Sequence, residues 1–517
     1  MPLNVKPYAS DLIIAALALA LGALYIAAAG GGFPLDDSWI HQTYGRNLAQ
    51  YGEWAFTPSI PSTASTSPLY TVLLAAGYWL RVPFQIWTHG LGIAALALTG
   101  IIGARLAQQA LPEHPRAGIV CGLALVGAWH LLWAAGAGME TMLFGMWTLV
   151  VIWLAWRQLR AASASQPPRS TVVWGAAFGI ASGLMTLTRA EGVLLVGLVA
   201  LALLIARPGM SWKSLFLYGA AAAITFFVVL LPYVSFNLQV TGGLLPNTAA
   251  SKRADLAALF ERPYLQRVVD MLIPLAAGAQ ILLLPGAALY GWGMMRRLRH
   301  QPAALLMLVP LAWSVCLVLL YAAYLPAFFQ HGRYVIPALP AFIVCGVVGT
   351  LMLAQRRPRT MMTRVLQRAL ILTLALTYIL MALLLGRDAY AKDVSIIESE
   401  MIPAAYWLRD NVPPEMLLAV HDIGAVGYFA PRPIIDLAGL VSPELLPVIP
   451  VEQNSDAVWE ILRERNARYV MGFADQLPGG NPADARLCPV FRARGTDAEV
   501  SDVYNMSIYE IAWDGGC

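Results

Sequence analysis

Two adjacent carboxylates, Asp36 and Asp37, are the feature of the sequence most suggestive of chemistry. They follow a long apolar run and a glycine cluster. Neighbouring carboxylates repel each other, so keeping both ionised beside an apolar segment requires a cation, a metal ion or strong hydrogen-bond donors. One carboxylate could take a proton from a hydroxyl as general base while the other orients a metal or a donor group. We prefer Asp37 as the base. The structural alternative is that either aspartate caps a helix over residues 38–49.

Two further acids, Glu140 and Glu191, stand in short polar breaks between apolar runs. Either acid could simply start the following helix, because negative charge is favoured at helix N-termini. Glu191 could also form a structural pair with Arg189, two residues before it. If these polar segments lie on the same membrane face as the acidic pair, their residues instead line one site with it. We then expect Glu140, Arg189, Glu191 and His41 to bind substrate.

Basic side chains occur in two other breaks, at residues 245–253 and 330–334. Guanidinium groups pair bidentately with phosphate oxygens and ammonium adds a point charge. A departing phosphate needs such partners. The alternative is contact with anionic lipid headgroups, which attract basic side chains without catalysis. The expected phosphate ligands are Lys252, Arg333, His331 and Tyr334, with Asn247 as a further substrate ligand.

The composition places most of the chain in lipid. Of 517 residues, 58% are hydrophobic and 12% are charged, far from the usage of soluble domains. The net charge of +4 gives no electrostatic case for a nucleic-acid partner. About eleven apolar runs approach the length of a transmembrane helix. They cover residues 11–30, 86–106, 117–134, 141–156, 171–188, 191–206, 215–236, 268–292, 303–325, 334–354 and 369–386.

Basic clusters between these runs predict which loops share a side. Two apolar runs separate each cluster from the next, so all the clusters fall on one face. That face is the cytoplasmic one, because short cytoplasmic loops collect Lys and Arg. The breaks that hold the acids and cations described above are then all extracytoplasmic. The clusters lie at 157–169, 207–213, 296–299 and 356–368.

The stretch 68–80 is apolar but, at about 13 residues, too short to cross a bilayer. We expect it to be an interfacial or re-entrant helix within a large first external loop, residues 31–85. The apolar runs stop after Gly386, which ends the predicted membrane domain, 1–386. Residues 387–517 have the mixed polarity of a soluble domain, with strand-like stretches, and parity places this α/β domain outside the cell.

Cysteine positions fit this division. Cys121, Cys316 and Cys345 lie inside apolar runs, where cysteine usually serves as a small hydrophobic residue. Cys488 and Cys517 lie in the C-terminal region and could form a disulfide if that region is extracytoplasmic.

The order of several short motifs along the chain resembles a known family. These motifs are Leu35-Asp36-Asp37, Thr66-Ser67-Pro68-Leu69, Gly138-Met139-Glu140-Thr141, Thr188-Arg189-Ala190-Glu191-Gly192, Pro246-Asn247-Thr248 with Lys252, and Arg333-Tyr334 with Pro337. Their joint order is similar to that of type C (GT-C) membrane glycosyltransferases. The similarity is greatest to mycobacterial arabinofuranosyltransferases and weaker to protein O-mannosyltransferases and aminoarabinose transferases. It extends into the C-terminal region at 422–428 and 435–440.

This resemblance implies a polytopic helical protein of about 11–13 transmembrane helices with an extracytoplasmic domain. It also implies inverting transfer of a sugar from a polyprenyl-phosphate donor to a glycan, lipid or protein acceptor. Lys252 and Arg333 would hold the donor phosphate. Members of the family differ in whether they need a divalent ion such as Mg²⁺, Mn²⁺ or Ca²⁺, and its ligands here would be Asp36 and Glu140. Related arabinosyl enzymes often have Arg-Pro-Asp or Arg-Pro-Glu where this chain has Arg189-Ala190-Glu191, which leaves the sugar open.

Two other functions compete with sugar transfer. The protein could be a transporter or flippase for a lipid-linked sugar, since charges within membranes also mark translocation paths. It could also be a non-catalytic membrane scaffold whose C-terminal domain binds a partner. The sequence disfavours a transporter, because its charges lie in loops rather than at mid-membrane.

Overall fold

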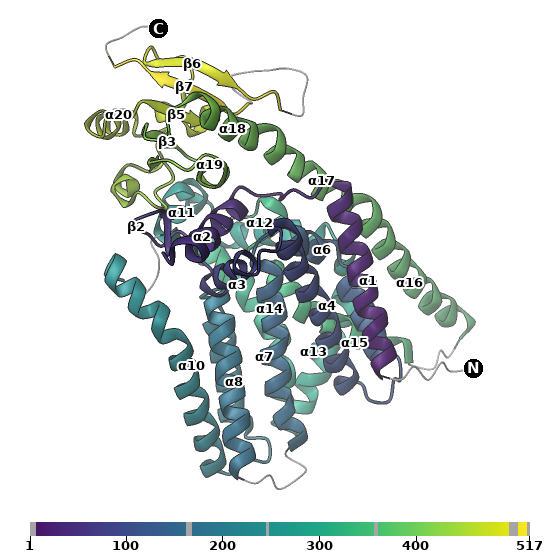
Figure 1. The fold of residues 1–517 in the computed structure, drawn as a ribbon. Helices are drawn as coiled ribbons and strands as arrows, with labels where there is room; N and C mark the ends of the chain where they lie inside the picture. Colours follow the sequence, from purple (N-terminus) through teal and green to yellow (C-terminus); the bar gives the residue numbers. More distant parts are fainter. Residues whose placement is uncertain (1–6, 162–167, 244–247, 356–359, 496–504, 514–516) are drawn as a thin grey trace.

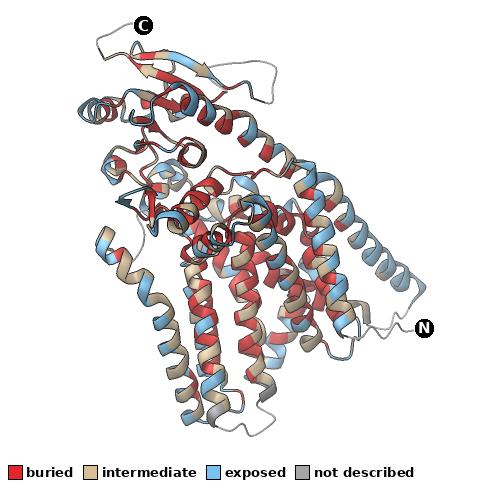
Figure 2. Ribbon diagram, in the orientation of Figure 1, coloured by how far each residue is buried: buried red, intermediate tan, exposed pale blue. Residues whose placement is uncertain are grey.

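The computed structural model describes residues 7–161, 168–243, 248–355, 360–495, 505–513 and 517. Long helices run side by side in one body, and a small sheet domain stands at one end of it (Figure 1). Asn247 and parts of two predicted basic clusters lie outside the described residues. Buried residues concentrate where the helices face one another, whereas exposed residues line the outer helix faces (Figure 2).

Within the described residues, eight helices are long and apolar enough to cross a membrane. Two bent helix pairs raise the number to ten, and α9 (Gly192–Ala206) is a shorter apolar helix. A helix therefore corresponds to each apolar run of the sequence. The long helices include α1 (Pro7–Ala28), α4 (Phe84–Ala110), α7 (Thr141–Ala161), α8 (Pro168–Thr188), α10 (Trp212–Thr241), α14 (Ala304–Tyr324), α15 (Leu339–Gln355) and α16 (Met361–Leu380).

Two of the predicted spans are not straight. The run 117–134 forms α5 (Ala117–Val126) and α6 (Trp129–Gly136), which are bent by 55°. The run 268–292 was expected as one span, but α12 (Tyr264–Ala276) meets the segment Ala279–Leu298, which contains α13 (Leu284–Leu298), at 104°. Pro274 lies in the last turn of α12, and proline lacks the amide hydrogen that continues a helix. Hydropathy alone cannot detect such a bend.

The predicted first loop contains α2 (Asp37–Tyr51), the hairpin β1–β2 (Ala55–Thr57 and Ile60–Pro61) and α3 (Pro68–Trp79). The last is the short apolar stretch, a helix of 12 residues. It packs closely on α2, because a Cβ at Gly45 would come within 2.9 Å of the Leu74 Cβ. This contact fixes the orientation of α2, whose first residue is Asp37.

The last long helix does not end at Gly386, where the sequence predicted a domain boundary. It continues for 51 residues, Met361–Asn411, through two short π-helical segments. These segments are Met381–Gly386 and Ile397–Met401, which separate α16 from α17 (Arg387–Ile396) and α17 from α18 (Ile402–Asn411). The composition changes at residue 386 within a continuous helix, and Tyr390 and Val394 beyond it are still buried in the apolar core.

The C-terminal domain is the α/β unit that the sequence predicted. Its mixed sheet has the order β4-β3-β5-β7-β6, in which β3 is parallel to both neighbours and β7 is antiparallel to β5 and β6. Two helices, α19 (Ile423–Phe429) and α20 (Ser455–Glu464), connect the strands. The strands are β3 (Leu418–Val420), β4 (Ile434–Asp436), β5 (Tyr469–Gly472), β6 (Leu487–Arg492) and β7 (Ser507–Ile511).

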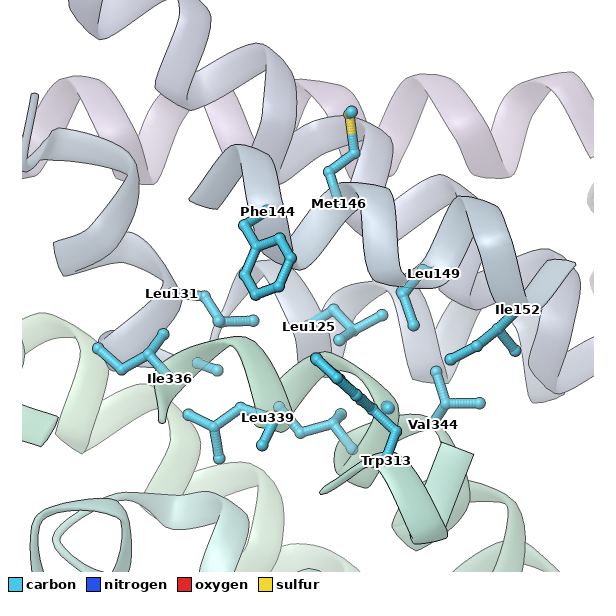
Figure 3. Packing of buried hydrophobic residues seen from close by; sticks show 14 of the residues in the cluster. Leu125, Leu131, Phe144, Met146, Leu149, Ile152, Trp313, Ile336, Leu339 and Val344 are labelled. Atoms are coloured by element: carbon cyan, nitrogen blue, oxygen red, sulfur yellow. The ribbon is translucent and has the colours of Figure 1, made fainter. Parts of the chain in front are cut away.

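A dense apolar core joins the long helices of the membrane body. Trp313 of α14 packs against Phe144 of α7 with ring centroids 6.0 Å apart, beside Leu339 of α15 (Figure 3). All three side chains are buried. Because interiors are close-packed, this core sets the relative positions of α7, α14 and α15. Glu140 directly precedes α7, and Arg333 lies in the turns that lead into α15, so the core also positions them.

A disulfide joins Cys488 to Cys517 across a separation of 29 residues. In the chain-entropy model, closing such a loop stabilises the folded state by roughly 3 to 4 kcal/mol. We therefore expect dithiothreitol to lower the unfolding temperature of the C-terminal domain, measured by calorimetry on purified protein. The double variant Cys488→Ser/Cys517→Ser should start at the lower temperature and show no further response to the reductant.

Candidate active site

Asp37, the first residue of α2, lies between two cations. Its Oδ2 accepts hydrogen bonds from Lys252 Nζ at 3.0 Å and from Arg333 Nη2 at 2.6 Å. Lys252 comes from α11 (Thr248–Asp255), and Arg333 from the helical turns that lead into α15. Both cations also donate to Tyr334 Oη, at 3.3 and 3.0 Å. Three of the four predicted phosphate ligands thus surround the preferred base.

The charges of this group reinforce one another. Burial would raise the pKa of Asp37, but the ion pairs with Lys252 and Arg333 outweigh it and hold that pKa well below its usual range. Burial would likewise lower the pKa of Lys252, but Asp37 raises it above its ordinary value. The carboxylate and the ammonium are therefore both charged at neutral pH.

Asp36 occupies the N-cap position of α2, yet its side chain makes no capping bond to that helix. Its two oxygens instead accept backbone hydrogen bonds from Gly424 and Ala425, at 2.6 and 2.8 Å, where α19 begins. A Cβ at position 424 would lie 2.0 Å from the Asp36 carbonyl oxygen, so this approach requires glycine. Asp36 therefore links the first loop to the C-terminal domain.

The two aspartates have opposite protonation preferences. Burial, reinforced by the negative charge of Asp422, raises the pKa of Asp36 to about 8. The pKa of Asp37 is shifted the other way. Neighbouring acids whose environments separate their pKa values are typical of sites that divide acid and base roles. At neutral pH, Asp37 is the ionised member of the pair.

A second polar group lies beside the first. Arg189 donates to Glu140 at 2.8 Å and to Tyr321 Oη at 2.6 Å. The other Glu140 oxygen faces His41 Nε2 at 3.3 Å. Glu191 accepts from Tyr321 Oη and lies 3.5 Å from Arg189 Nε. The residues that the sequence assigned to substrate binding and that the structure describes therefore form one network, completed by a tyrosine of α14.

This network allows a test of stability. Burial would raise the pKa of Glu140, but His41 and Arg189 lower it to about 2. Removing one partner of a buried pair costs roughly 3–5 kcal/mol, because the remaining charge is left uncompensated. We expect Arg189→Gln to lower the unfolding temperature clearly and Arg189→Gln/Glu140→Gln to recover part of the loss.

The sign of the pH dependence follows from the lowered pKa. The stabilisation by ionised Glu140 is present above its ordinary pKa of 4.5 and is lost as the pH falls toward 2. The unfolding temperatures of the wild type and the double variant should therefore approach each other as the pH falls from 7 to 3. Arg207 is exposed, so Arg207→Ala is a control that should change neither the unfolding temperature nor its pH dependence.

Three cavities reach Asp37, and two of them also reach Lys252. The larger of these two has a volume of about 320 Å³, with the Glu140–Arg189 network on one side and apolar side chains on the other. The smaller, of about 160 Å³, lies between α11 and the C-terminal domain. The two cavities share the wall formed by Asp37, Lys252, Arg333 and Tyr334. The apolar side of the larger cavity includes Tyr233, Leu320, Tyr324 and Leu325.

Several buried polar atoms on these walls have no hydrogen-bond partner in the described part of the chain, among them Arg333 Nη1 and Thr248 Oγ1. The Arg333 side chain is only 7% exposed. An unpaired buried donor is costly, so each one requires an explanation. Because both residues line the larger cavity, the atoms indicate a polar ligand there.

The structure does not bring His331 to this group. Gln330 and His331 both have positive φ, 51° and 57°, just before Arg333. The imidazole pairs with Asp393 of α17 at 2.8 Å and lies edge-on to Trp129 and Trp133. His331 thus helps to hold the turn that presents Arg333 rather than facing the cavities at Asp37.

The predicted metal ligands, Asp36 and Glu140, do not converge on one site. Among the described residues, no three His, Cys, Asp or Glu side chains are grouped so that they could hold a metal ion. Both Asp36 oxygens accept backbone N–H groups, and Glu140 pairs with Arg189. The cations Lys252 and Arg333 already occupy Asp37 Oδ2. Asp36 and Glu140 therefore do not form the divalent-ion site that the sequence predicted.

Several residues of the site carry no sequence signal. Tyr321 lies in an apolar run, where tyrosine is an ordinary packing residue. Asp255 and His421, which line the smaller cavity, lie next to the segments 245–253 and 422–428 but outside both. His421 does follow a buried strand, β3, and functional side chains often gather at such strand ends, which is the one signal that could have indicated it.

Comparisons with known proteins place the chain in the GT-C glycosyltransferase fold. ArnT from Cupriavidus metallidurans, in a structure bound to undecaprenyl phosphate, is 16% identical with a TM-score of 0.58, and 98% of each chain is covered. The Archaeoglobus fulgidus oligosaccharyltransferase, in a complex with Zn and sulfate, is 13% identical with a TM-score of 0.62 over 97% of this chain and 75% of that one.

The mycobacterial arabinofuranosyltransferase AftD is 15% identical with a TM-score of 0.53, over 97% of this chain and 40% of that one. No curated protein sequence matches the chain significantly. The family model that matches is a domain of unknown function, DUF8728, at residues 390–509. The expected GT-C fold with a C-terminal domain is thus confirmed.

Proposed function

We propose that the protein transfers a sugar from a polyprenyl-phosphate donor to an extracytoplasmic acceptor, with inversion and with Asp37 as general base. The observation that carries this proposal is the position of Asp37. It lies where two cavities meet, bound to two cations, one of which has an unpaired buried nitrogen. A transferase needs such a meeting point, because its base must reach the acceptor while the donor phosphate lies beside it.

The larger cavity suits the donor. Its apolar wall can hold the first isoprene units, and Lys252 and Arg333 can hold the phosphate. Glu140, Arg189 and His41 line the same cavity and can bond the sugar hydroxyls. The structures of ArnT with undecaprenyl phosphate and of the archaeal oligosaccharyltransferase with a dolichol-phosphate support this assignment.

The same cations explain how the base becomes active. In the ligand-free site they hold Asp37 ionised but weakly basic. A donor phosphate competes for Lys252 and Arg333, so donor binding loosens their hold on the carboxylate and raises its pKa. The acceptor hydroxyl then gives its proton to Asp37 and attacks the anomeric carbon. The bond from that carbon to the phosphate oxygen breaks, and the cations stabilise the departing phosphate.

Two independent features support an extracytoplasmic site. The basic clusters predict that the helix ends opposite the C-terminal domain are cytoplasmic. The Cys488–Cys517 disulfide requires an oxidising compartment, which agrees with an extracytoplasmic C-terminal domain. The site and this domain then share the outer face of the cell membrane.

A direct test supplies purified protein with a radiolabelled polyprenyl-phosphate pentose or hexose and follows the label. The proposal expects label in a glycan, lipid or protein acceptor and release of polyprenyl phosphate. Movement of intact donor across vesicle membranes without bond cleavage would instead identify a flippase. Unchanged transfer by both Asp37→Asn and Asp36→Asn would contradict the assignment of the site.

A further inference from the structure

The smaller cavity beside Asp37 contains a polar cluster that the proposed donor site does not use. His421 Nδ1 lies 3.1 Å from Asp422, and His421 Nε2 lies 3.9 Å from Asp255. His421 and Asp422 follow β3 of the C-terminal domain, whereas Asp255 is the last residue of α11. The cluster therefore lies where the C-terminal domain meets the helix that carries Lys252.

We infer that this cavity is the acceptor subsite and that it binds one uncharged sugar unit, with His421, Asp255 and Asp422 bonding its hydroxyls. The inference rests on the proposed function, because it takes Asp37 as the base that the acceptor must reach. It adds the class of acceptor, a glycan end rather than an anionic lipid or a peptide, and the residues that select it.

The chemistry of the cavity wall favours a sugar. Hydroxyl groups both donate and accept, and the cluster offers carboxylate acceptors next to an imidazole donor. Phe329 lines the same cavity and is 40% exposed, so its ring can cover the apolar C–H face of a sugar ring.

The charge of the cluster disfavours an anionic acceptor. Burial would lower the pKa of His421, but the nearby carboxylates of Asp255 and Asp422, the latter hydrogen-bonded to the imidazole, raise it well above its usual value. One imidazolium between two carboxylates leaves a net negative charge. A phospholipid headgroup would meet like charge here, whereas Lys252 and Arg333 are already engaged by Asp37 and, in the complex, by the donor.

The geometry supports a single unit. The cavity has a volume of about 160 Å³, and Asp37 and His421 both line it. A sugar held by the cluster therefore lies in the same space as the proposed base. The donor approaches Asp37 from the other side of the shared wall, so one hydroxyl of the acceptor can face both the base and the anomeric carbon.

The test compares His421→Ala and Asp255→Asn with wild type in full-length protein. The acceptor probes are octyl glycosides of mannose, glucose and arabinose, with phosphatidylglycerol and a serine-containing peptide as competing classes. We expect KM for a glycoside to rise about 10-fold or more in both variants, since each loses a hydrogen bond to a charged group. Binding of undecaprenyl phosphate and kcat should change little. His300→Ala, distant from the site, is the matched control.

Three results would overturn the inference: an unchanged glycoside KM in both variants, a loss of undecaprenyl phosphate binding, or preferred use of the lipid or peptide. Unfolding temperatures of the variants show whether the C-terminal domain is intact. Saturation-transfer NMR with the same glycosides separates the two hypotheses. If wild type transfers no sugar, the proposed function fails. Glycoside binding by wild type that disappears in His421→Ala would still support the subsite. If wild type binds no glycoside, the subsite is rejected.

Discussion

Asp37→Asn is expected to lower the rate of sugar transfer by about 10²- to 10⁴-fold, the usual contribution of a general base. The asparagine keeps the shape of the side chain but cannot take the acceptor proton. It also removes the negative charge that Lys252 and Arg333 neutralise in the ligand-free site. We therefore expect the variant to bind undecaprenyl phosphate as well as wild type or more tightly. Single-turnover kinetics and equilibrium binding measure the two effects separately.

The neighbouring residue provides the control. Asp36 has a pKa of about 8 and is mostly protonated at neutral pH, so Asp36→Asn changes its charge little. Its effect on transfer should stay within about 10-fold, well below the loss expected for the base. Equal losses in the two variants would contradict the assignment of Asp37, as would a loss of phosphate binding in Asp37→Asn.

The pH profile provides a second check on the base. If donor binding loosens the ion pairs of Asp37, as proposed, its pKa should be higher in the donor complex than in the free protein. Protonation then inactivates the base at a higher pH in the complex. The acidic limb of kcat, which reports the complex, should lie above the acidic limb of kcat/KM, which reports the free protein.

Arg333→Ala should produce the second large effect, on donor binding. Truncating one member of a buried charged pair costs roughly 2–5 kcal/mol, which corresponds to at least about 30-fold in affinity. The variant removes the guanidinium from the phosphate and leaves Asp37 with Lys252 alone. We expect a higher KM for the donor and weaker binding of undecaprenyl phosphate, with partial recovery in Arg333→Lys.

Arg253→Ala is the matched control for this prediction. Arg253 is one residue from Lys252 on α11 but stacks on Phe260 and Tyr324 instead of pairing with Asp37. Its removal should leave donor binding unchanged. If Arg333→Ala binds undecaprenyl phosphate normally, the phosphate lies elsewhere in the larger cavity, and Arg333 serves only to hold Asp37.

The sequence predicted the membrane body well because hydropathy acts locally. Each apolar run corresponds to a helix, and the short stretch 68–80 is a separate helix packed on α2. The spacing of the basic clusters also placed the loops that carry Asp37, Lys252 and Arg333 on one face, and the structure shows these residues in contact. The 104° bend after α12 was missed, because it depends on one proline and a few backbone angles rather than on average hydropathy.

The pairings within the site could not be read from the sequence. Asp37 is 215 residues from Lys252 and 296 from Arg333, and nothing local indicates that these charges neutralise one another. Tyr321 has no signal because it lies in an apolar run. The different partners of Asp36 and Asp37 could not be predicted either, because they depend on which surface covers each carboxylate.

The bond between Asp36 and α19 has a consequence for the order in which the protein is made. Gly424 is synthesised 388 residues after Asp36, when nearly the whole membrane body has emerged from the ribosome. Until then the loop that presents Asp37 lacks its partner on the C-terminal domain. We therefore expect the site to be completed last during biogenesis. A chain truncated before the C-terminal domain would then reach the membrane without a complete active site.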